Sequence, residues 1–568
     1  MKNILFPLAI TLGLVLPLRA GSETPSPADT IFVNGNVYTV NDARPHAAAI
    51  AIRGERILFV GSNEEAKKYS GPSTRTIDLA GKTVVPGLTD SHYHILGVGE
   101  RLTRLNLEDA TSREIFLNEV KQAAQKSEPG RWLTGRGWIE TFWKPPVFPT
   151  REDVDRVAPA IPVFLVRADG HSAVANGAAL KAAGIDRTTA DPFGGQILRD
   201  KKTGEPTGML LDNAMELVEK KIPPSSPEDN EKAIFLGALR TVQLGWCKIQ
   251  NAGSYLPQFE LMEKLYGQGK LKLRIYNAVY GPGEAADKIL RDGPILDAYD
   301  HHFTTRTIKI VFDGSLGSRS AALLEPYSDA DTSGFLTQKE ADLRPMLRAA
   351  LRRGIQVETH AIGDRANRII LDLYEEAFQA VPPNERKVKE PRWRVEHAQI
   401  LSPSDIPRFA KLGVIASMQP SHAISDLFFA PSRLGEKRLA GAYAWQSLLK
   451  SGAIITAGSD APVQQGNPMI EFYAAVARKS QNGFSGPGWH PEQAVSRQQA
   501  LEMLTRWPAY AAFQENEKGS IAPGKLADLT ILSADIMQIP EPDILRTHCL
   551  MTVIGGEIAY DAGELAHP

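Results

Sequence analysis

The amino-acid sequence predicts an α/β fold: a TIM-type (β/α)8 barrel with an inserted subdomain, joined to a small β-sandwich built from both chain ends. Three observations lead to this prediction. The middle of the 568-residue chain alternates strand-like apolar segments with helical stretches, both ends contain short strands separated by turns, and one gap between strands is unusually long. At ~150 residues per domain, a chain of this length needs several domains or one large barrel with attachments.

The N-terminus has the composition of a targeting segment followed by a linker. A basic start at Lys2 precedes the apolar run Ile4–Leu18, and a small residue stands at Ala20. This pattern is typical of a secretory signal peptide over residues 1–20 with a linker over 21–29, and it predicts an exported protein, periplasmic or secreted. The apolar run is short for a membrane span, so no stable membrane insertion is expected after cleavage; an uncleaved anchor is the alternative.

Both ends of the remaining chain consist of short predicted strands. Residues 30–82 include IFVNGNVYTV and AAAIAIRGERILFVG, in which Asn34-Gly35 and Arg53-Gly54 are hairpin signals. Residues 515–568 include ADLTILSAD and CLMTVIGGEIAYD. Because a few isolated strands make a poor domain, we expect the two ends to pair into one β-sandwich.

The middle of the chain, residues 83–514, contains eight candidate strands. They are Thr83–His92, Gly245–Gln250, Lys272–Val279, Thr307–Gly314, Ile355–Ala361, Trp393–Ala398, Val414–Pro420 and Ala453–Ala461. Eight β/α units predict a TIM-type barrel. Roughly 140 residues separate the first two strands, far more than an ordinary connection, so we expect an inserted subdomain at about 99–240 over the barrel mouth.

Composition and charge are those of an ordinary globular protein. Hydrophobic residues make up 43% and charged residues 23%, and the formal net charge is −2. This balance gives no electrostatic footprint for nucleic acid or for an anionic membrane, so the expected partner is a small-molecule substrate. Cys247 and Cys549 are too few for a disulfide framework and are predicted to be buried.

Polar residues gather at the carboxyl ends of the predicted strands, where the active sites of such barrels lie. His92 and His94 end the first strand, and because residues i and i+2 share one face of a strand, both imidazoles can bind one metal ion. The other candidates are Lys309 on the fourth strand, His360 on the fifth, His397 on the sixth and Asp460 on the eighth. Each alone has a structural explanation, such as a packed histidine or a turn-forming aspartate. Together they favour a hydrolytic zinc site.

Longer motifs resemble those of the amidohydrolase superfamily, specifically its amidohydrolase-3 (YtcJ-like) branch. PGLTDSHYH resembles the superfamily's first-strand signature, and DGSLGSRSA, ETHAIGDRAN, RVEHAQ, SMQPSH and AGSDAPV resemble the branch's motifs in order. DGHSAVAN in the insertion and GSIAPGKLADL near the C-terminus do so as well. The resemblance extends from about Asp29 to Asp561. The chain departs from the commonest relatives in having GLTD in place of GFID, which removes no ligand.

The resemblance implies a role for each matching residue. The implied metal ligands are His92, His94, Lys309, His360, His397 and Asp460. Lys309 stands where relatives carry a carboxylated lysine that bridges two metals, and Asp460 would also be the general acid/base. The implied reaction is hydrolysis of a non-peptide C–N bond, in which a metal-activated hydroxide attacks an amide-type carbonyl and Asp460 transfers the proton to the leaving nitrogen. Some superfamily members use one metal, so one or two zinc ions are expected, and a homodimer is common among relatives.

Five further residues are candidates for substrate binding: His171, Asn176, Arg319, Asp364 and His422. For His171 and Asn176 the alternative is a turn in the insertion, and for Arg319 it is a buried ion pair. Asp364 is equally suited to cap a helix that begins at Arg365.

Two other functions remain open on the sequence alone. A metal-using isomerase or lyase would share the same fold and the same ligands, since function is decided in the pocket. A metal-free binding scaffold is the third hypothesis, against which the intact ligand set argues. The substrate is not named by the sequence: N-formyl or N-acyl amines, acylated amino acids and cyclic amides all remain open.

Overall fold

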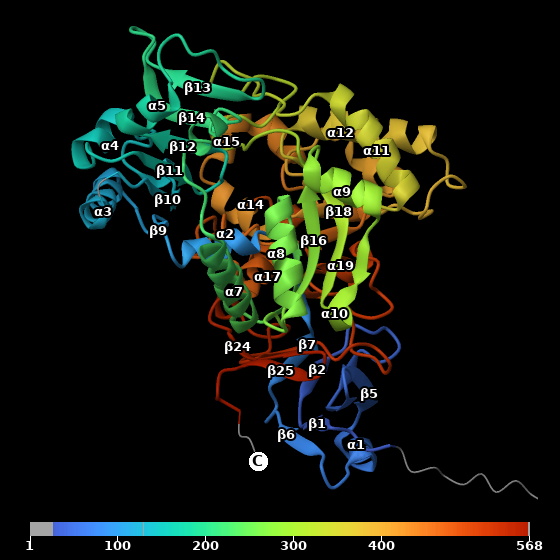
Figure 1. Ribbon diagram of the computed structural model, residues 1–568. Helices are drawn as coiled ribbons and strands as arrows, with labels where there is room; N and C mark the ends of the chain where they lie inside the picture. The colour runs from blue at the N-terminus through green and yellow to red at the C-terminus, as the bar shows by residue number, and fades with distance from the viewer. Residues whose placement is uncertain (1–25, 129, 566–568) are drawn as a thin grey trace, which may run out of the picture.

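The computed structural model describes residues 26–128 and 130–565 and contains a nearly closed, eight-stranded parallel barrel (Figure 1). Its strands are β8 (Leu88–Tyr93), β15 (Trp246–Asn251), β16 (Arg274–Tyr280), β18 (Phe303–Val311), β19 (Gln356–Ala361), β20 (Arg394–His397), β21 (Ile415–Met418) and β22 (Ile455–Ala457). They follow one another around the barrel in chain order. The predicted fold class is therefore confirmed. The predicted signal peptide, residues 1–20, lies outside the described residues.

The barrel closes between β8 and the segment that follows β22. The backbone N–H of Asp460 donates to the carbonyl of His92 at 2.7 Å, and the N–H of His94 donates to the carbonyl of Ala461 at 2.8 Å. Gly458 permits this approach, because a Cβ at that position would lie 2.4 Å from the backbone nitrogen of His92. Closure therefore places the polar side chains of the first and last strand ends beside each other.

Helices cover the outside of the barrel, so its strands are buried almost throughout, as is typical of parallel sheets. The helices that follow the strands are α2 (Ile95–Arg101), α7 (Pro227–Gln243), α8 (Leu256–Gly267), α9 (Glu284–Asp292), α11 (Glu340–Arg353), α12 (Asp364–Ala380), α13 (Ile406–Leu412), α16 (Trp445–Lys450) and α17 (Pro468–Ala477). In α12, Ile370, Tyr374 and Ala377 recur at helical spacing and are buried against the barrel core.

One predicted strand is corrected by the structure: residues 83–92 form two strands rather than one. β7 (Thr83–Pro86) pairs with strands outside the barrel, and β8 begins at Leu88. Gly87 lies between them in a crowded place, where a Cβ would be 2.7 Å from the Cβ of Asp528. Both pieces are apolar and buried, so the pattern of hydrophobic residues carries no sign that the chain changes sheets there.

The two chain ends form a β-sandwich at the bottom of Figure 1. One sheet contains β5 (Arg56–Gly61), β4 (Ala49–Arg53), β1 (Thr30–Val33) and β6 (Arg75–Asp78); the other contains β25 (Glu557–Asp561), β24 (Cys549–Ile554), β23 (Leu529–Leu532), β7, β2 (Asn36–Tyr38) and β3 (His46–Ala47). Antiparallel pairing of β7 with β23 joins the two ends of the chain. Phe32, Ile50, Ile531 and Val553 belong to the apolar core between the sheets.

The insertion has its own mixed six-stranded sheet, at the upper left of Figure 1. In sheet order its strands are β13 (Gly195–Arg199), β14 (Pro206–Asp212), β12 (Ser172–Ala175), β11 (Val163–Arg167), β10 (Leu133–Trp138) and β9 (Leu105–Asn106). The helices α3 (Arg113–Lys126), α4 (Arg151–Val157), α5 (Gly177–Ala183) and α6 (Glu216–Glu219) accompany the sheet. Helix α7 begins within the predicted insertion but continues to Gln243 and belongs to the barrel wall instead; its Thr241 donates to the Tyr93 hydroxyl of β8 at 2.9 Å.

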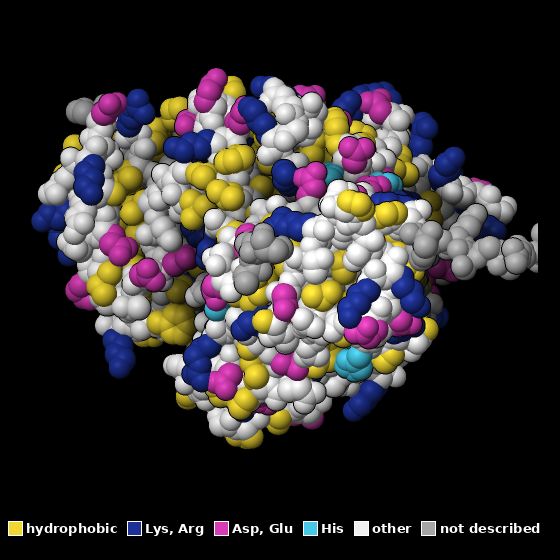
Figure 2. Space-filling model, turned by 90° about the horizontal axis from the view of Figure 1, so that it is seen from below, with side chains coloured by type: hydrophobic (Ala, Val, Ile, Leu, Met, Phe, Trp, Pro, Cys, Tyr) yellow, Lys and Arg dark blue, Asp and Glu magenta, His cyan; other side chains and the backbone are white. Residues whose placement is uncertain are grey.

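The surface carries both signs of charge. On the face seen in Figure 2, Lys and Arg side chains are interspersed with Asp and Glu, in keeping with the formal net charge of −2. Within residues 26–128 and 130–565, no helix has the length and apolar composition needed to cross a bilayer. Cys247 and Cys549 are buried free thiols, as predicted.

Candidate metal centre

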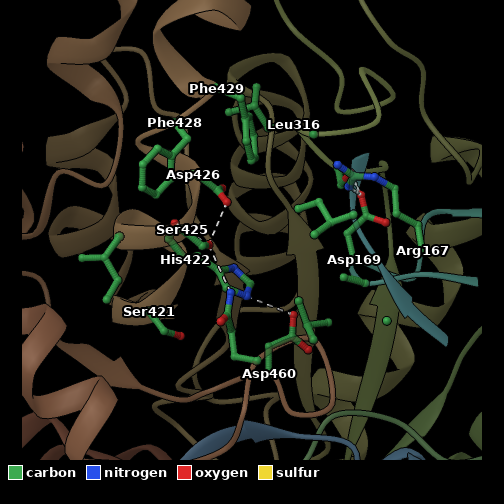
Figure 3. A pocket seen from close by; sticks show the side chains of 18 of the residues that line it. Arg167, Asp169, Leu316, Ser421, His422, Ser425, Asp426, Phe428, Phe429 and Asp460 are labelled. Atoms are coloured by element: carbon green, nitrogen blue, oxygen red, sulfur yellow. Dashed lines mark hydrogen bonds and ion pairs between the residues drawn. The ribbon is translucent and has the colours of Figure 1, made fainter. Parts of the chain in front are cut away.

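The carboxyl ends of the barrel strands bring histidine and aspartate side chains together. His92, His94 and Asp460 place potential ligand atoms within 4.8 Å of one another, and so do His397, His422 and Asp460. Asp460 belongs to both groups: its Oδ1 lies 3.2 Å from Nε2 of His94, and its Oδ2 lies 3.7 Å from Nε2 of His422 (Figure 3). The two groups therefore share one carboxylate.

His360 extends this cluster on the side of β19. Its ring centroid lies 4.4 Å from that of His397, which in turn lies 4.9 Å from that of His92. His422 stacks on His397 with the ring planes 7° apart. Five histidines and one aspartate from across the barrel thus form one continuous group, and four of the histidines are those that the sequence places at strand ends.

Lys309 lies beside the same cluster. Its Nζ donates to Nε2 of His92 at 3.3 Å. Because the side chain is buried, the pKa of Lys309 is lowered from its ordinary value. A lower pKa raises the fraction of neutral amine, the form that carboxylation requires, so the environment of Lys309 fits a carbamate as well as a structural amine.

The donor atoms fit a divalent metal ion. Nδ1 of His397 and Nε2 of His422 are buried and have no hydrogen-bond partner, a costly arrangement that a bound cation relieves. Burial lowers the pKa of His92 to about 4 and those of His360 and His397 well below 6.5. These imidazoles are therefore neutral at pH 7, which is the form that binds metal. Neutral imidazoles with a carboxylate are typical zinc ligands.

A buried carboxylate, that of Glu396, holds the candidate ligand His92 in place. Nδ1 of His92 donates to Glu396 at 2.5 Å, and Nε of Arg394 donates to the same carboxyl group at 2.7 Å. Burial opposes ionisation of Glu396, but Arg394 outweighs it and the pKa of Glu396 falls to about 2. Such carboxylates fix the tautomer and orientation of a ligand histidine. The sequence analysis missed Glu396, although a charged residue within a buried strand is a usable signal.

The backbone is strained at two of the candidate ligands. His397 has φ = 73° and Asp460 has φ = 57°, a left-handed conformation that is uncommon for residues other than glycine. His397 ends β20, and Asp460 lies three residues after the end of β22. Strain of this kind concentrates at functional sites, where the surrounding structure holds it in place.

The cluster opens into a pocket of about 630 Å³ (Figure 3). The insertion contributes Arg167, Asp169 and His171 to its wall, and the segment that follows β21 contributes His422 and Phe428. The insertion therefore shapes the space in which a substrate would lie. Arg167 and Asp169 were also missed by the sequence analysis; both follow or end a buried strand in VFLVRADG.

Two of the five predicted substrate-binding residues, His171 and His422, line the pocket. Nδ1 of His171 lies 2.6 Å from Oδ1 of Asp212, and its ring centroid lies 4.8 Å from that of His360. A carboxylate only accepts hydrogen bonds, so this contact assigns the proton to Nδ1 and leaves Nε2 for a ligand. Burial opposes the charged form of His171, but Asp212 outweighs it and raises the pKa above 6.5.

The other three predicted substrate-binding residues do not line the pocket. Asn176 caps helix α5 with its side chain. Arg319 forms a two-pronged ion pair with Asp329 at 3.0 and 2.9 Å, and Asp364 accepts the backbone N–H of Leu324 at 2.8 Å. The geometry gives them structural partners, and substrate contact is not supported. In a sequence, short polar residues near strand ends look alike whether they hold backbone groups or face a ligand.

Comparisons with known proteins match almost the whole chain. A family model described as the amidohydrolase family matches residues 75–560. Protein LONG AFTER FAR-RED 3 of Arabidopsis thaliana is 36% identical over 94% of this chain and 92% of its own length. Putative amidohydrolase YtcJ of Bacillus subtilis is 33% identical over 94% and 99%, and N-substituted formamide deformylase of Arthrobacter pascens is 27% identical over 94% and 98%.

The fold of a solved structure is also similar. It belongs to an uncharacterized metal-dependent hydrolase of Pyrococcus horikoshii, with a TM-score of 0.71 at 27% identity, covering 90% of this chain and 99% of that one. The family match includes every barrel strand and every candidate metal ligand between His92 and Asp460. This chain therefore belongs to the amidohydrolase family.

Proposed function

We propose that this hydrolase cleaves a non-peptide, amide-type C–N bond in a small-molecule substrate. The observation that carries the proposal is the pair of ligand groups that share Asp460 at the barrel mouth. Hydrolysis follows from membership of the amidohydrolase family. The choice of an amide-type bond is supported by similarity to N-substituted formamide deformylase, whose name states a formamide, which is an amide, as the compound it acts on.

The proposal also assigns the residues that would bind the metal ions. His92 and His94 would hold one zinc ion, His360 and His397 would hold a second, and Lys309, as a carbamate, would complete the ligand set. A divalent metal, when bound there, supplies Lewis acidity, which acidifies water and polarises a carbonyl oxygen. Burial favours the neutral amine of Lys309, from which the carbamate forms.

The side chains around the ligands supply proton transfer and orientation. Asp460 takes a proton from the attacking water and returns it to the leaving nitrogen. His422 lies beside that carboxylate, with its Nε2 3.7 Å from Oδ2 of Asp460, and forms part of the pocket wall. On the opposite wall, His171 is held by Asp212 and contacts the substrate through Nε2. The barrel supplies the reacting groups and the insertion helps to position the substrate.

Export belongs to the same proposal. The basic start, short apolar run and small residue within residues 1–20 support a cleaved signal peptide and a periplasmic or secreted location. A homodimer remains an expectation from the resemblance.

The first experiment measures metals per chain by elemental analysis, on full-length protein purified without chelator from zinc-supplemented cells. About two equivalents per chain are expected, together with metal-dependent release of amine from a panel of N-formyl, N-acyl and cyclic amides. One equivalent would make Lys309 a structural lysine. Absence of metal, with no uptake on reconstitution, would overturn the proposal; conversion of the same compounds without amine release would assign an isomerase or lyase.

A further inference from the structure

The pocket has an apolar side away from the candidate ligands. In Figure 3, Phe428, Phe429 and Leu316 lie together in the upper part of the pocket, whereas Asp460 lies at the bottom. Phe142 of the insertion lines the same pocket. Its volume of about 630 Å³ falls in the range of ~300–1,000 Å³ that holds a whole drug-sized molecule, far more than one amide group.

Two exposed phenylalanines, Phe142 and Phe428, line this side of the pocket, and a third, Phe484, packs on Phe428 outside the lining. The rings of Phe142 and Phe428 are 5.3 Å apart, and Phe428 stacks on Phe484 at 5.2 Å. Phe142 is 46% exposed, Phe428 is 41% exposed and Phe484 is 56% exposed. Single exposed apolar residues need no explanation, but a contiguous group at a pocket marks a binding surface.

The three rings come from three separate segments. Phe142 ends the short 3-10 helix η2 (Glu140–Phe142) of the insertion, Phe428 lies between α14 (Pro420–Asp426) and α15 (Ala430–Leu434), and Phe484 follows α17. We refer to Phe142, Phe428 and Phe484 as the aromatic rim. Because its members are brought together only by the fold, the rim is a tertiary feature of the pocket rather than a run of apolar sequence.

The charged side chains of the pocket disfavour an anionic substrate. Among the described residues that line it, Arg167 is the only lysine or arginine. Its guanidinium is already engaged by Glu140 at 2.7 Å and by Asp169 at 2.5 Å. The remaining charged lining residues are acidic: Glu108, Asp109, Asp169, Asp426 and Asp460. A substrate carboxylate away from the reacting amide would find no free lysine or arginine and would lie among like charges. His171, whose charged form Asp212 favours, is already paired with the Asp212 carboxylate.

The aromatic rim and the carboxylate that serves the leaving nitrogen in the proposed reaction lie at the two ends of α14. Oδ2 of Asp460 lies 3.7 Å from Nε2 of His422, in the first turn of α14. Phe428 follows the same helix by two residues. An apolar group on the leaving nitrogen can therefore reach the rim along α14.

We infer that the substrate is a neutral amide whose amine portion carries an apolar arm, an aromatic ring or an alkyl chain, that packs against the aromatic rim. The inference rests on the proposed C–N hydrolysis and excludes acylated amino acids as the preferred class. In the reaction, the C–N bond breaks, the water oxygen forms a bond to the acyl carbon, and one water proton moves to nitrogen. The carboxylic acid that forms then ionises, so a carboxylate, a proton and an apolar amine leave. Aromatic surfaces favour such arms through burial and ring stacking.

Three matched amides test the inference with zinc-loaded, full-length protein. N-acetyl-2-phenylethylamine carries the arm, N-acetylphenylalanine adds only a carboxylate, and N-ethylacetamide lacks only the ring; the N-formyl counterparts extend the set to a smaller acyl group. The expected kcat/KM for the phenylethyl amide exceeds that for either of the others by about 10-fold or more. Equal or faster hydrolysis of N-acetylphenylalanine would overturn the inference.

Variants connect the preference to the aromatic rim. Phe428→Ala and Phe484→Ala are expected to lower kcat/KM for the phenylethyl amide by about 5- to 10-fold and to lower kcat/KM for N-ethylacetamide by less than about 2-fold. Phe193→Ala is the matched control, because Phe193 is also 56% exposed but neither lines the pocket nor stacks on a ring that does. Equal losses on both amides, or an equal loss in the control, would contradict a role for the rim.

A binding measurement separates this inference from the proposed function. Calorimetric titration of the three amides into the zinc-loaded Asp460→Asn variant, in which turnover is expected to be slow, gives their relative Kd values. If none of the amides is cleaved but the phenylethyl amide binds about 10-fold more tightly than the other two, the proposed C–N hydrolysis is wrong and the apolar binding site is supported. If the three amides are cleaved with equal kcat/KM and bind with equal Kd, the proposed hydrolysis is supported and the apolar binding site is wrong.

Discussion

Glu396 lies 2.5 Å from Nδ1 of His92, and the other nitrogen of the same ring lies 3.3 Å from Lys309 and 3.6 Å from Asp460. One buried ring therefore links a supporting carboxylate on β20 to the candidate metal centre. Because the contact fixes the proton on Nδ1, it leaves Nε2 as the nitrogen available to a metal.

Glu396→Gln is expected to weaken metal binding by about 10- to 100-fold, because the amide is a poorer acceptor for Nδ1–H. The measurement is the metal content retained in a series of chelator buffers. Glu358→Gln is the control: it changes a neighbouring buried carboxyl whose pKa burial raises to about 7 and whose Oε1 has no hydrogen-bond partner. Metal retention by Glu396→Gln equal to that of the unmodified chain would contradict the assignment.

Asp460→Asn is expected to lower kcat by about 10²- to 10⁴-fold, since an amide cannot carry the proton from water to nitrogen. Steady-state kinetics on a cleaved amide provide the measurement, and elemental analysis separates lost chemistry from lost metal. Asp109→Asn, at an exposed carboxylate on the same pocket, is the control. A variant at Asp460 that keeps both metal and kcat would refute the proton-transfer role.

Lys309→Met is expected to reduce the metal content from about two equivalents to about one, because the proposed carbamate would no longer form. A second readout is ¹³C-labelled bicarbonate, whose label should enter the unmodified chain as a carbamate and be absent from the variant. Lys248→Met is the control. Lys248 is another buried barrel lysine with a lowered pKa, but it donates to Gln514 away from the histidines, so its loss should change neither readout.

Asp212→Asn is expected to lower kcat/KM by about 10-fold while leaving the metal content unchanged. The carboxylate holds the proton on Nδ1 of His171, and an amide can bind the opposite tautomer instead. His171→Asn should give a similar loss, and the double variant should lose no more than either single one, because the two residues act as a unit. Additive losses in this double-mutant cycle would show that the two side chains work independently.

Acid stability should depend on the ion pair between Arg274 of β16 and Asp528 of the terminal sandwich, whose closest atoms are 2.9 Å apart. Burial opposes ionisation of Asp528, but Arg274 outweighs it and lowers the pKa below 3.8. A lowered folded-state pKa contributes stability that is complete above the unfolded value of ~3.9 and disappears as the pH falls through the folded value. Asp528→Asn should therefore cost about 3–5 kcal/mol at pH 7 and progressively less below pH ~4.

Urea unfolding at pH 7 and at pH 3 measures this difference. Asp292→Asn, which removes an exposed carboxylate paired with Lys288, serves as the control and should have no measurable effect. A loss that stays the same at both pH values would exclude the charge of Asp528 as its cause.

The barrel could be predicted because its strands are buried on both faces and appear as short apolar runs. His92, His94, His360 and His397 stood out for a related reason: polar side chains at the ends of such runs are conspicuous. The split at Gly87 could not be found in this way, since β7 and β8 are both apolar and differ only in the sheet they join. Which sheet a strand joins depends on partners that are distant in sequence.

The remaining parts of the site depend on long-range contacts. Glu396 and His92 are 304 residues apart, and Phe142 meets Phe428 only because the insertion folds over the barrel mouth. The role of Asp212 follows from its contact with His171, which lies in a different connection between strands. Asn176, Arg319 and Asp364 were selected by their place in motifs, but their side chains hold backbone groups or an ion pair. A motif predicts which residues lie near the site, whereas the contacts in the folded chain determine the role of each side chain.

The pairing of β7 with β23 also has a consequence for biosynthesis. The amide of Leu88, directly after β7, donates to Thr530 of β23, 442 residues later in the chain. During synthesis, β7 is made before almost the entire barrel, and its partner β23 is made only afterwards. A chain that stops early therefore leaves the edge of β7 unpaired. Unpaired edges recruit other strands, so truncated products should aggregate, and only a chain translated through β23 can close its terminal sheet.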